Sequence, residues 1–292
     1  MKEKDEGEEE GGGEEGKVIF NYSVFEETED IFSSLANSQR LAILYIISQN
    51  QKTLSEIAKE LKVTKQETHR NLNRLMNSNV IEKDFKGYFS LTIFGDMLIK
   101  NISAINFLSK HKKFFSEHNF HDIPIKFIQR IGALEKSEFI AGFVAVIEYI
   151  KRMYQNCEKY IYSILPQVPL DLIHTAIPLV KEKELKLKHI LPIDALIPKK
   201  SEEFLKKEGY SQLLQKGRIE RRMVTRTNLG IVLTEKQALV MFPQTQGQVD
   251  MNFIMCNDIS MDNGLFHEWC YDFFIETWHN AKTYDPYKLK KV

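Results

Sequence analysis

The feature that most constrains the fold is the segment LSEIAKELKVTKQETHRNLNRLMNSNVIEKDFKGYFSLT at residues 54–92. Its first part places apolar side chains at the i, i+3, i+4 and i+7 positions of one helix face, namely Leu54, Ile57, Ala58 and Leu61. Thr53 and Glu56 have capping-box spacing at the start of this helix. After a short turn, Thr64 and Glu67 repeat that spacing. The segment therefore predicts two short helices joined by a tight turn.

The second predicted helix, residues 65–77, has one apolar and one polar face. The inward face carries Thr68, Leu72, Leu75 and Met76. The polar face carries side chains that can reach base edges and phosphates in the major groove of DNA: Lys65, Gln66, His69, Arg70 and Asn73. Thr64, at the start of the helix, is a further candidate for DNA contact. The alternative is an ordinary packed helix with a solvated polar face.

Two short strands are predicted after this helix, at 80–83 and 88–91, around the turn 84–87. On such a hairpin, Lys83 and Lys86 would meet phosphates. The order of helix, helix, turn, recognition helix and hairpin indicates a winged helix-turn-helix, preceded by helices around Ile31 and Leu44.

This order of elements, over roughly residues 36–95, resembles the winged helix-turn-helix of the ArsR-like family of prokaryotic regulators. The resemblance implies a homodimer that binds double-stranded DNA, because two-fold proteins read two half-sites about one helical turn apart. A helix predicted at 94–117 would help to pair the subunits. One branch of the family senses metals through cysteines, but helices 54–61 and 65–77 contain none. We therefore expect no metal site, and interpret His69 as DNA-facing or solvated.

Charge is unevenly distributed along the chain. Residues 1–17 are acidic and glycine-rich, have almost no apolar side chains, and are predicted to be disordered. The formal net charge of the whole chain is zero, so the remainder is mildly basic. A mildly basic body suits nucleic acid, but many enzymes share it.

The composition also favours a cytoplasmic protein. No apolar run approaches the ~18–20 residues needed to cross a bilayer, and the N-terminus does not resemble a secretory signal. The cysteines lie far apart and form no Cys-x-x-Cys pair, which argues against a disulfide framework and a cysteine zinc site. We expect no membrane contact and three buried thiols, Cys157, Cys256 and Cys270.

A second domain is predicted after a boundary at residues 118–125, so that 18–117 form the first domain and 118–292 the second. Helices are expected at 140–153, 170–182 and 265–281. Strands are expected at 159–165, 185–192, 218–226, 231–234, 238–243 and 250–256. This alternation predicts a mixed sheet flanked by helices, and an α+β protein overall.

The whole chain resembles archaeal regulators that join a winged helix to a methanogenesis-regulator middle domain. The resemblance rests on the segments 124–134, 218–226, 228–253 and 266–281. It implies a phospholipase-D-like fold without catalysis. In the His-x-Lys-x-x-x-x-Asp signature of active enzymes, His111 and Lys113 would begin the motif, but His118 stands where aspartate is required. We expect no catalytic residues and no cofactor.

The segment 181–226 is rich in lysine and arginine. In the strand 218–226, Arg222 and Arg226 would share one face and Arg221 and Thr225 the other. Arg222 and Arg226 are therefore candidates for binding a small anionic effector, with solvated surface charge as the alternative. The function that these patterns favour is a DNA-binding transcription regulator with a C-terminal sensing or dimerisation domain. The rivals are a hydrolase carrying a winged-helix appendage and a winged-helix scaffold for protein interactions.

Overall fold

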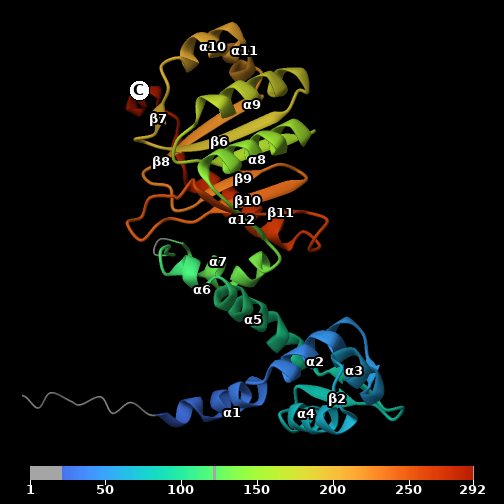
Figure 1. Ribbon diagram of the computed structural model, residues 1–292. Helices are drawn as coiled ribbons and strands as arrows, with labels where there is room; N and C mark the ends of the chain where they lie inside the picture. The colour runs from blue at the N-terminus through green and yellow to red at the C-terminus, as the bar shows by residue number, and fades with distance from the viewer. Residues whose placement is uncertain (1–21, 121–122, 292) are drawn as a thin grey trace, which may run out of the picture. The chain divides into compact units, whose positions relative to one another are not determined.

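The computed structural model describes residues 22–120 and 123–291, and Figure 1 shows their helices and strands. The acidic segment 1–17 lies outside the described residues. Contacts between residues divide the chain into two compact units, Met1–Ile99 and Lys100–Val292. Both contain helices and strands, so the protein belongs to the α+β class, as the sequence predicts.

The first unit is a winged helix-turn-helix. Its three strands pair in the order β1-β3-β2. Buried aliphatic side chains from the helices and strands form its core, including Ile43, Ile57, Leu72 and Leu75. Its elements are a 3-10 helix η1 (Tyr22–Phe25), α1 (Glu26–Leu35), α2 (Ser38–Gln49), β1 (Lys52–Thr53), α3 (Leu54–Leu61), α4 (Lys65–Asn77), β2 (Ile81–Lys83), β3 (Tyr88–Leu91) and the start of α5 (Ile93–Lys110).

Both predicted capping boxes are present, and they fix where α3 and α4 begin. The Thr53 hydroxyl accepts from the Glu56 backbone N–H, and the Thr53 backbone N–H donates to the Glu56 carboxylate at 2.8 Å. At the C-terminal end of α3, Lys62 adopts a left-handed conformation with φ 56°. The backbone N–H of Val63 then bonds the Ala58 carbonyl at 3.1 Å, so the chain turns within three residues.

Helix α5 begins with a close backbone approach inside the first unit. The backbone N–H of Gly95 donates to the Thr92 hydroxyl at 2.9 Å. A Cβ atom on Gly95 would lie 1.9 Å from the Val80 carbonyl oxygen, which is far inside van der Waals contact. Only glycine at position 95 therefore allows the first turn of α5 to pack against the backbone of Val80, the residue before β2.

The second unit is built on a sheet of eight strands in the order β12-β8-β6-β5-β9-β10-β11-β4. β5, β6 and β8 run parallel to one another, and the other neighbouring pairs are antiparallel, so the sheet is mixed as predicted. The strands are β4 (Glu138–Ala141), β5 (Tyr160–Ile164), β6 (Lys186–Pro192), β8 (Ile219–Val224), β9 (Gly230–Leu233), β10 (Gln237–Met241), β11 (Phe253–Asp258) and β12 (Lys282–Thr283). A separate parallel pair joins β7 (Leu196–Ile197) to β13 (Lys290–Lys291).

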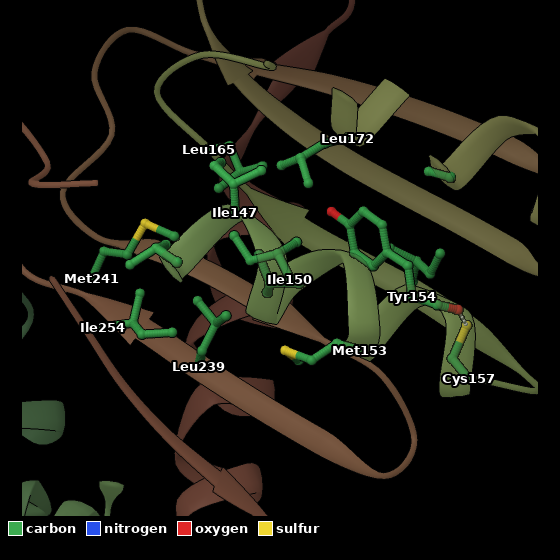
Figure 2. Packing of buried hydrophobic residues seen from close by; sticks show 14 of the residues in the cluster. Ile147, Ile150, Met153, Tyr154, Cys157, Leu165, Leu172, Leu239, Met241 and Ile254 are labelled. Carbon is green, nitrogen blue, oxygen red and sulfur yellow. Dashed lines mark hydrogen bonds between the residues drawn. The ribbon is translucent and has the colours of Figure 1, made fainter. Parts of the chain in front are cut away.

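Helices cover both faces of the large sheet (Figure 1). Successive residues of a strand point to opposite faces. Val232 therefore packs with the cluster under α8 and α9, and its neighbours Ile231 and Leu233 pack with the cluster under α12. Figure 2 shows part of the first cluster. The helices of this unit are α6 (Lys112–Phe115), α7 (Ile125–Gln129), η2 (Ile131–Leu134), α8 (Phe143–Asn156), α9 (Leu170–Glu182), α10 (Ser201–Lys207), α11 (Tyr210–Gln215), α12 (Leu265–Asn280) and η3 (Pro286–Lys288).

The division between the units differs from the boundary expected at 118–125. The end of α5 packs into the second unit because Phe107 is fully buried in the cluster that contains Phe127 and Trp269. The predicted helix 94–117 is also interrupted at His111, where α5 gives way to the short α6. Helical periodicity indicates an apolar face, but does not say which unit that face packs against.

All three cysteines lie in the second unit. Cys157, Cys256 and Cys270 are free and buried, as expected. Burial raises the pKa of the Cys157 and Cys256 thiols to about 11, so both remain protonated at neutral pH. No helix within the described ranges is long and apolar enough to cross a membrane.

Candidate nucleic-acid interface

The recognition helix α4 presents its polar face to solvent, because the opposite face is used for packing. Thr68, Leu72 and Leu75 are each 0% exposed. The predicted contact residues Lys65, Gln66, His69 and Arg70 are all exposed, and Asn73 is half-buried. The helix therefore carries two cationic side chains and hydrogen-bonding groups on one accessible face.

Thr64 acts mainly as the cap of this helix. Its hydroxyl accepts from the Glu67 backbone N–H at 3.1 Å and lies 3.0 Å from a Glu67 carboxylate oxygen. The backbone N–H of Thr64 donates to the same carboxylate at 3.2 Å. These bonds, from the backbone N–H first and the hydroxyl second, hold the pKa of Glu67 below its usual range. They also keep its negative charge at the helix N-terminus, where the helix dipole favours it.

Two of the predicted contact residues interact with each other. The Asn73 amide nitrogen lies 3.3 Å from His69 Nδ1, one helical turn away. This contact orients both side chains along the exposed face. Arg70 lies at the edge of a polar hollow of about 340 Å³ that also includes Asn37, Ser38 and Gln39 at the start of α2.

The wing is a β2–β3 hairpin held by Asp84. One Asp84 carboxylate oxygen accepts from the backbone N–H groups of Lys86 at 2.9 Å and Tyr88 at 2.8 Å. Both predicted lysines are exposed: Lys83 Nζ lies 5.5 Å from the Phe89 ring centroid, and Lys86 Nζ lies 5.4 Å from that of Phe85. The wing therefore presents its two ammonium groups to solvent.

Phe85, at the wing tip, is a surface residue that sequence reasoning missed. Its side chain is 94% exposed, which is unusual for phenylalanine. The available signal was its position between Asp84 and Lys86 in a predicted turn, where no core can form. An aromatic ring beside a lysine at the wing tip adds an apolar contact to the charged surface.

Arg222 and Arg226, the two residues predicted to bind an anionic effector, do not form one site. Strand β8 ends at Val224, so Arg226 lies beyond it and the pair does not share a strand face. Arg222 instead donates to the Trp278 carbonyl at 2.6 Å and lies 4.7 Å from the ring centroid of that residue. Arg226 lines two hollows, of about 220 and 760 Å³, and Arg222 lines neither. The predicted strand was too long because charged residues and threonine continue the alternating pattern past Val224.

The three residues of the incomplete phospholipase signature do not lie together on one helix. His118 is buried, not helical, and stacked on Phe114 with ring centroids 3.7 Å apart. Its ring nitrogens lie 2.9 Å from the Phe114 carbonyl and 3.4 Å from the Asp250 carboxylate. Lys113 lies in α6, and His111 precedes it. His118 is thus part of a buried polar contact between distant segments.

Metal ligation has no support in the described ranges, where no three His, Cys, Asp or Glu side chains are placed to hold an ion. His69 has an asparagine neighbour rather than further ligands.

A capped, exposed recognition helix followed by a basic hairpin defines the first unit as a winged helix-turn-helix of the DNA-binding class. Residues 37–83 match the sequence model of a family described as bacterial regulatory protein, arsR family. This match covers α2, α3, α4 and β2, the part of the chain where the sequence analysis found the resemblance. No curated protein sequence matches the chain.

Several solved structures share parts of the arrangement at low similarity. The chain is 14% identical to TrmBL2, described as an archaeal chromatin protein with a novel mode of DNA binding, over 82% of this chain and 92% of that chain, with a TM-score of 0.38. It is 20% identical to the homodimeric winged helix-turn-helix domain Mb0332 of Mycobacterium bovis, over 28% and 81%, with a TM-score of 0.27. It is 8% identical to Nuc, a phospholipase D family member of Salmonella typhimurium, over 51% and 99%, with a TM-score of 0.30. TM-scores this low carry no inference about function.

Proposed function

We propose that the protein is a transcription regulator that binds double-stranded DNA as a homodimer, with α4 in the major groove and the wing on the backbone. The observation that carries this proposal is the polar face of α4, which combines the exposed Lys65, Gln66, His69 and Arg70 with the half-buried Asn73. Phosphate contacts from lysine and arginine give affinity, and amide contacts to base edges give sequence preference.

The wing supports the same proposal. Lys83 and Lys86 are exposed on a hairpin whose turn is fixed by Asp84. A fixed turn reduces the backbone entropy that the wing would lose on meeting a duplex. The arsR family match over residues 37–83 supports the regulatory role.

Pairing of two subunits is proposed to use α5. Its exposed apolar side chains include Ile93 at 86% exposed, Met97 at 62%, Ile105 at 51% and Leu108 at 40%. Ile93 and Met97 are four residues apart and Ile105 and Leu108 are three apart, and these spacings place the members of each pair on one side of the helix. An exposed apolar stripe on a long helix is typical of a protein–protein interface. A second copy of the chain would bury this stripe and provide a two-fold pair of recognition helices.

The second unit is proposed to bind a signal rather than to catalyse a reaction. The incomplete phospholipase signature supports this proposal. Both ring nitrogens of His118 contact protein groups, the Phe114 carbonyl and the Asp250 carboxylate. This part of the proposal also draws on the resemblance to archaeal regulators with a middle domain of this kind.

Selection of bound duplexes from a random pool tests the proposal. We expect the full-length protein to enrich an inverted repeat whose half-sites are about one helical turn apart. The Lys65→Ala/Arg70→Ala variant should enrich nothing, and Arg152→Ala, in the second unit, is the matched control. If the wild-type protein and the double variant enrich the same sequences equally, the α4 surface does not read DNA. If the wild-type protein enriches no sequence at all, the winged helix would instead serve as a protein-interaction scaffold.

A further inference from the structure

Three polar side chains form a row across the parallel part of the large sheet. Ser163 on β5 is paired in register with His189 on β6, and His189 with Arg221 on β8. Ser163 and His189 point to the face covered by α8 and α9, because the adjacent Ile164 and Ile190 belong to the cluster under α12. Arg221 shares this face, because Ile219, two residues before it on β8, belongs to the cluster under α8 and α9. A polar row between an apolar sheet and apolar helices requires a reason, since burying polar groups is costly.

The row lies at the floor of a cavity of about 100 Å³ within the second unit. The walls are mainly apolar and come from α8, α9, α10, β6 and the segment after β5, including Tyr154, Leu165, Leu172, Ala176 and Leu205. Figure 2 shows three of these wall residues, with the Tyr154 hydroxyl directed toward Leu172. Two more aromatic residues, Tyr210 and Tyr284, complete the lining beside Arg221.

His189 has one ring nitrogen satisfied and one unsatisfied. Its Nδ1 lies 2.5 Å from the Ser163 hydroxyl oxygen. Its Nε2 is buried and has no hydrogen-bond partner within the described part of the chain. Burial first, and the nearby Arg221 second, lower the pKa of His189 to about 3, so the ring is neutral at physiological pH. When the Ser163 hydroxyl donates to Nδ1, the proton of the neutral ring lies on Nε2, which becomes a donor.

Arg221 is the only arginine among the described residues that line the cavity. Its guanidinium carbon lies 3.7 Å from the Tyr284 ring centroid and 5.2 Å from that of Tyr210. Among the described residues, no carboxylate forms an ion pair with it. Two aromatic rings hold the planar group in place and leave its N–H donors available.

We propose that this cavity binds a small carboxylate with an apolar chain, the carboxylate lying between Arg221 and the Nε2–H of His189 and the chain against α9. An arginine fork matches the geometry of a carboxylate, and the histidine adds one neutral donor. A cavity of about 150 Å³ holds the six carbons of benzene, so one of about 100 Å³ suits an apolar chain of about three to four carbons. The inference concerns the second unit alone and does not depend on DNA binding.

The same Ser163–His189 pair does not favour acyl transfer. A general base must accept the serine proton and become positively charged. Burial first, and the Arg221 charge second, oppose that positive charge and lower the pKa of the imidazole. The arrangement therefore suits binding of an anion better than activation of a nucleophile.

Thermal unfolding of the full-length protein with a panel of probes tests the proposal. We expect butyrate, valerate or isovalerate at millimolar concentration to raise the melting temperature, and 1-pentanol and acetate to leave it nearly unchanged. Pentanol keeps the apolar chain without the charge, and acetate keeps the charge without the chain. If none of the three carboxylates stabilises the wild-type protein, or if pentanol stabilises it as much as valerate does, the proposal is overturned.

Two variants assign the effect to this cavity by calorimetric titration. Arg221→Gln removes the charge and should weaken carboxylate binding at least about tenfold. Ala176→Leu keeps Arg221 but fills the apolar part, and should also abolish binding. Arg152→Gln, another arginine above a tyrosine ring but outside the cavity, is the matched control and should bind normally. Unchanged affinity in both cavity variants would overturn the proposal. Hydrolysis of 4-nitrophenyl butyrate that disappears in Ser163→Ala would instead assign the cavity to catalysis.

Discussion

The cationic side chains that are candidates for ligand contact lie in different surroundings in the two units. In the first unit, Lys65 and Arg70 on α4 and the two wing lysines are exposed to solvent. In the second unit, Arg221 and Arg222 are half-buried and lie against aromatic rings. Exposed cations on a convex helix suit a long polyanion, whose phosphates approach from outside. Enclosed cations suit either a small ligand or a structural bond to the protein itself.

Neighbouring arginines on one strand show how local this difference is. Arg221 points to the α9 side, where a cavity lies beside it. Arg222 points to the α12 side, where the Trp278 carbonyl at the end of that helix accepts its hydrogen bond. Adjacent positions in a strand thus give one residue available to a ligand and one that supports the fold.

The largest expected effect concerns the exposed surface. Lys65→Ala/Arg70→Ala should weaken duplex binding roughly a hundredfold at low salt, because two charge-assisted contacts are lost. Each lost phosphate contact should also flatten the log–log dependence of affinity on salt by about one unit. Fluorescence anisotropy across a salt series measures both quantities. An unchanged salt slope would mean that these two side chains do not touch phosphates.

The next effect concerns sequence preference rather than affinity. Gln66→Ala or Asn73→Ala should relax the preference for the cognate duplex by about 1–3 kcal/mol, if the amide contacts a base through two hydrogen bonds. Binding to a random duplex should remain as in the wild type. Competition between cognate and random duplexes measures the difference. A uniform loss on both duplexes would assign these amides to the backbone instead.

A third effect distinguishes the two arginines of β8. Arg222→Met should reduce the free energy of unfolding by about 2 kcal/mol, because it removes a charged donor from the Trp278 carbonyl and a cation–π contact. Urea denaturation measures the loss, and Arg152→Met, an exposed site, should change it by less than about 0.5 kcal/mol. Carboxylate binding should survive in the Arg222 variant. If it is lost there and kept in Arg221→Gln, the two roles are reversed.

The smallest effect concerns the cap of the recognition helix. Thr64→Ala should reduce stability by about 1 kcal/mol at neutral pH, and Thr64→Ser should restore most of it. The lowered pKa of Glu67 makes the contribution of the capping box pH-dependent. A depressed pKa in the folded state stabilises the protein above the unfolded pKa, and this stabilisation disappears as the pH falls through the folded value. The difference between wild type and Thr64→Ala should therefore shrink below about pH 4. A difference that is constant down to pH 3 would contradict this role of Glu67.

The first unit was predictable in detail because its signals are local. Both capping boxes join residues three positions apart, and α3 and α4 occupy the predicted ranges 54–61 and 65–77. The exposure of the α4 contact residues follows from the same periodicity that buries Leu72 and Leu75. What the sequence could not show was the His69–Asn73 contact, which depends on side-chain rotamers.

The second unit was predictable only in outline. The mixed sheet and the long helices α9 and α12 are present as expected, but β4, α10 and α11 were missed. β4 is a four-residue edge strand whose partner β11 lies more than a hundred residues later, so no local pattern signals it. The sequence also did not show which face of β8 borders a cavity. Both sides of the sheet are covered by helices, and the alternation of residues along the strand is the same for either side.

The pairing of β4 with β11 has a consequence for synthesis of the chain on the ribosome. Glu138 pairs with Cys256, about 120 residues further on, which takes roughly 6–24 seconds to translate. During this time the first unit is already complete, while β4 has no strand to join. Lys136 and Glu138, beside and within this strand, are the charged residues that discourage an exposed edge from joining another chain. The order in which the ribosome delivers the strands therefore makes those two charges matter most before the native sheet exists.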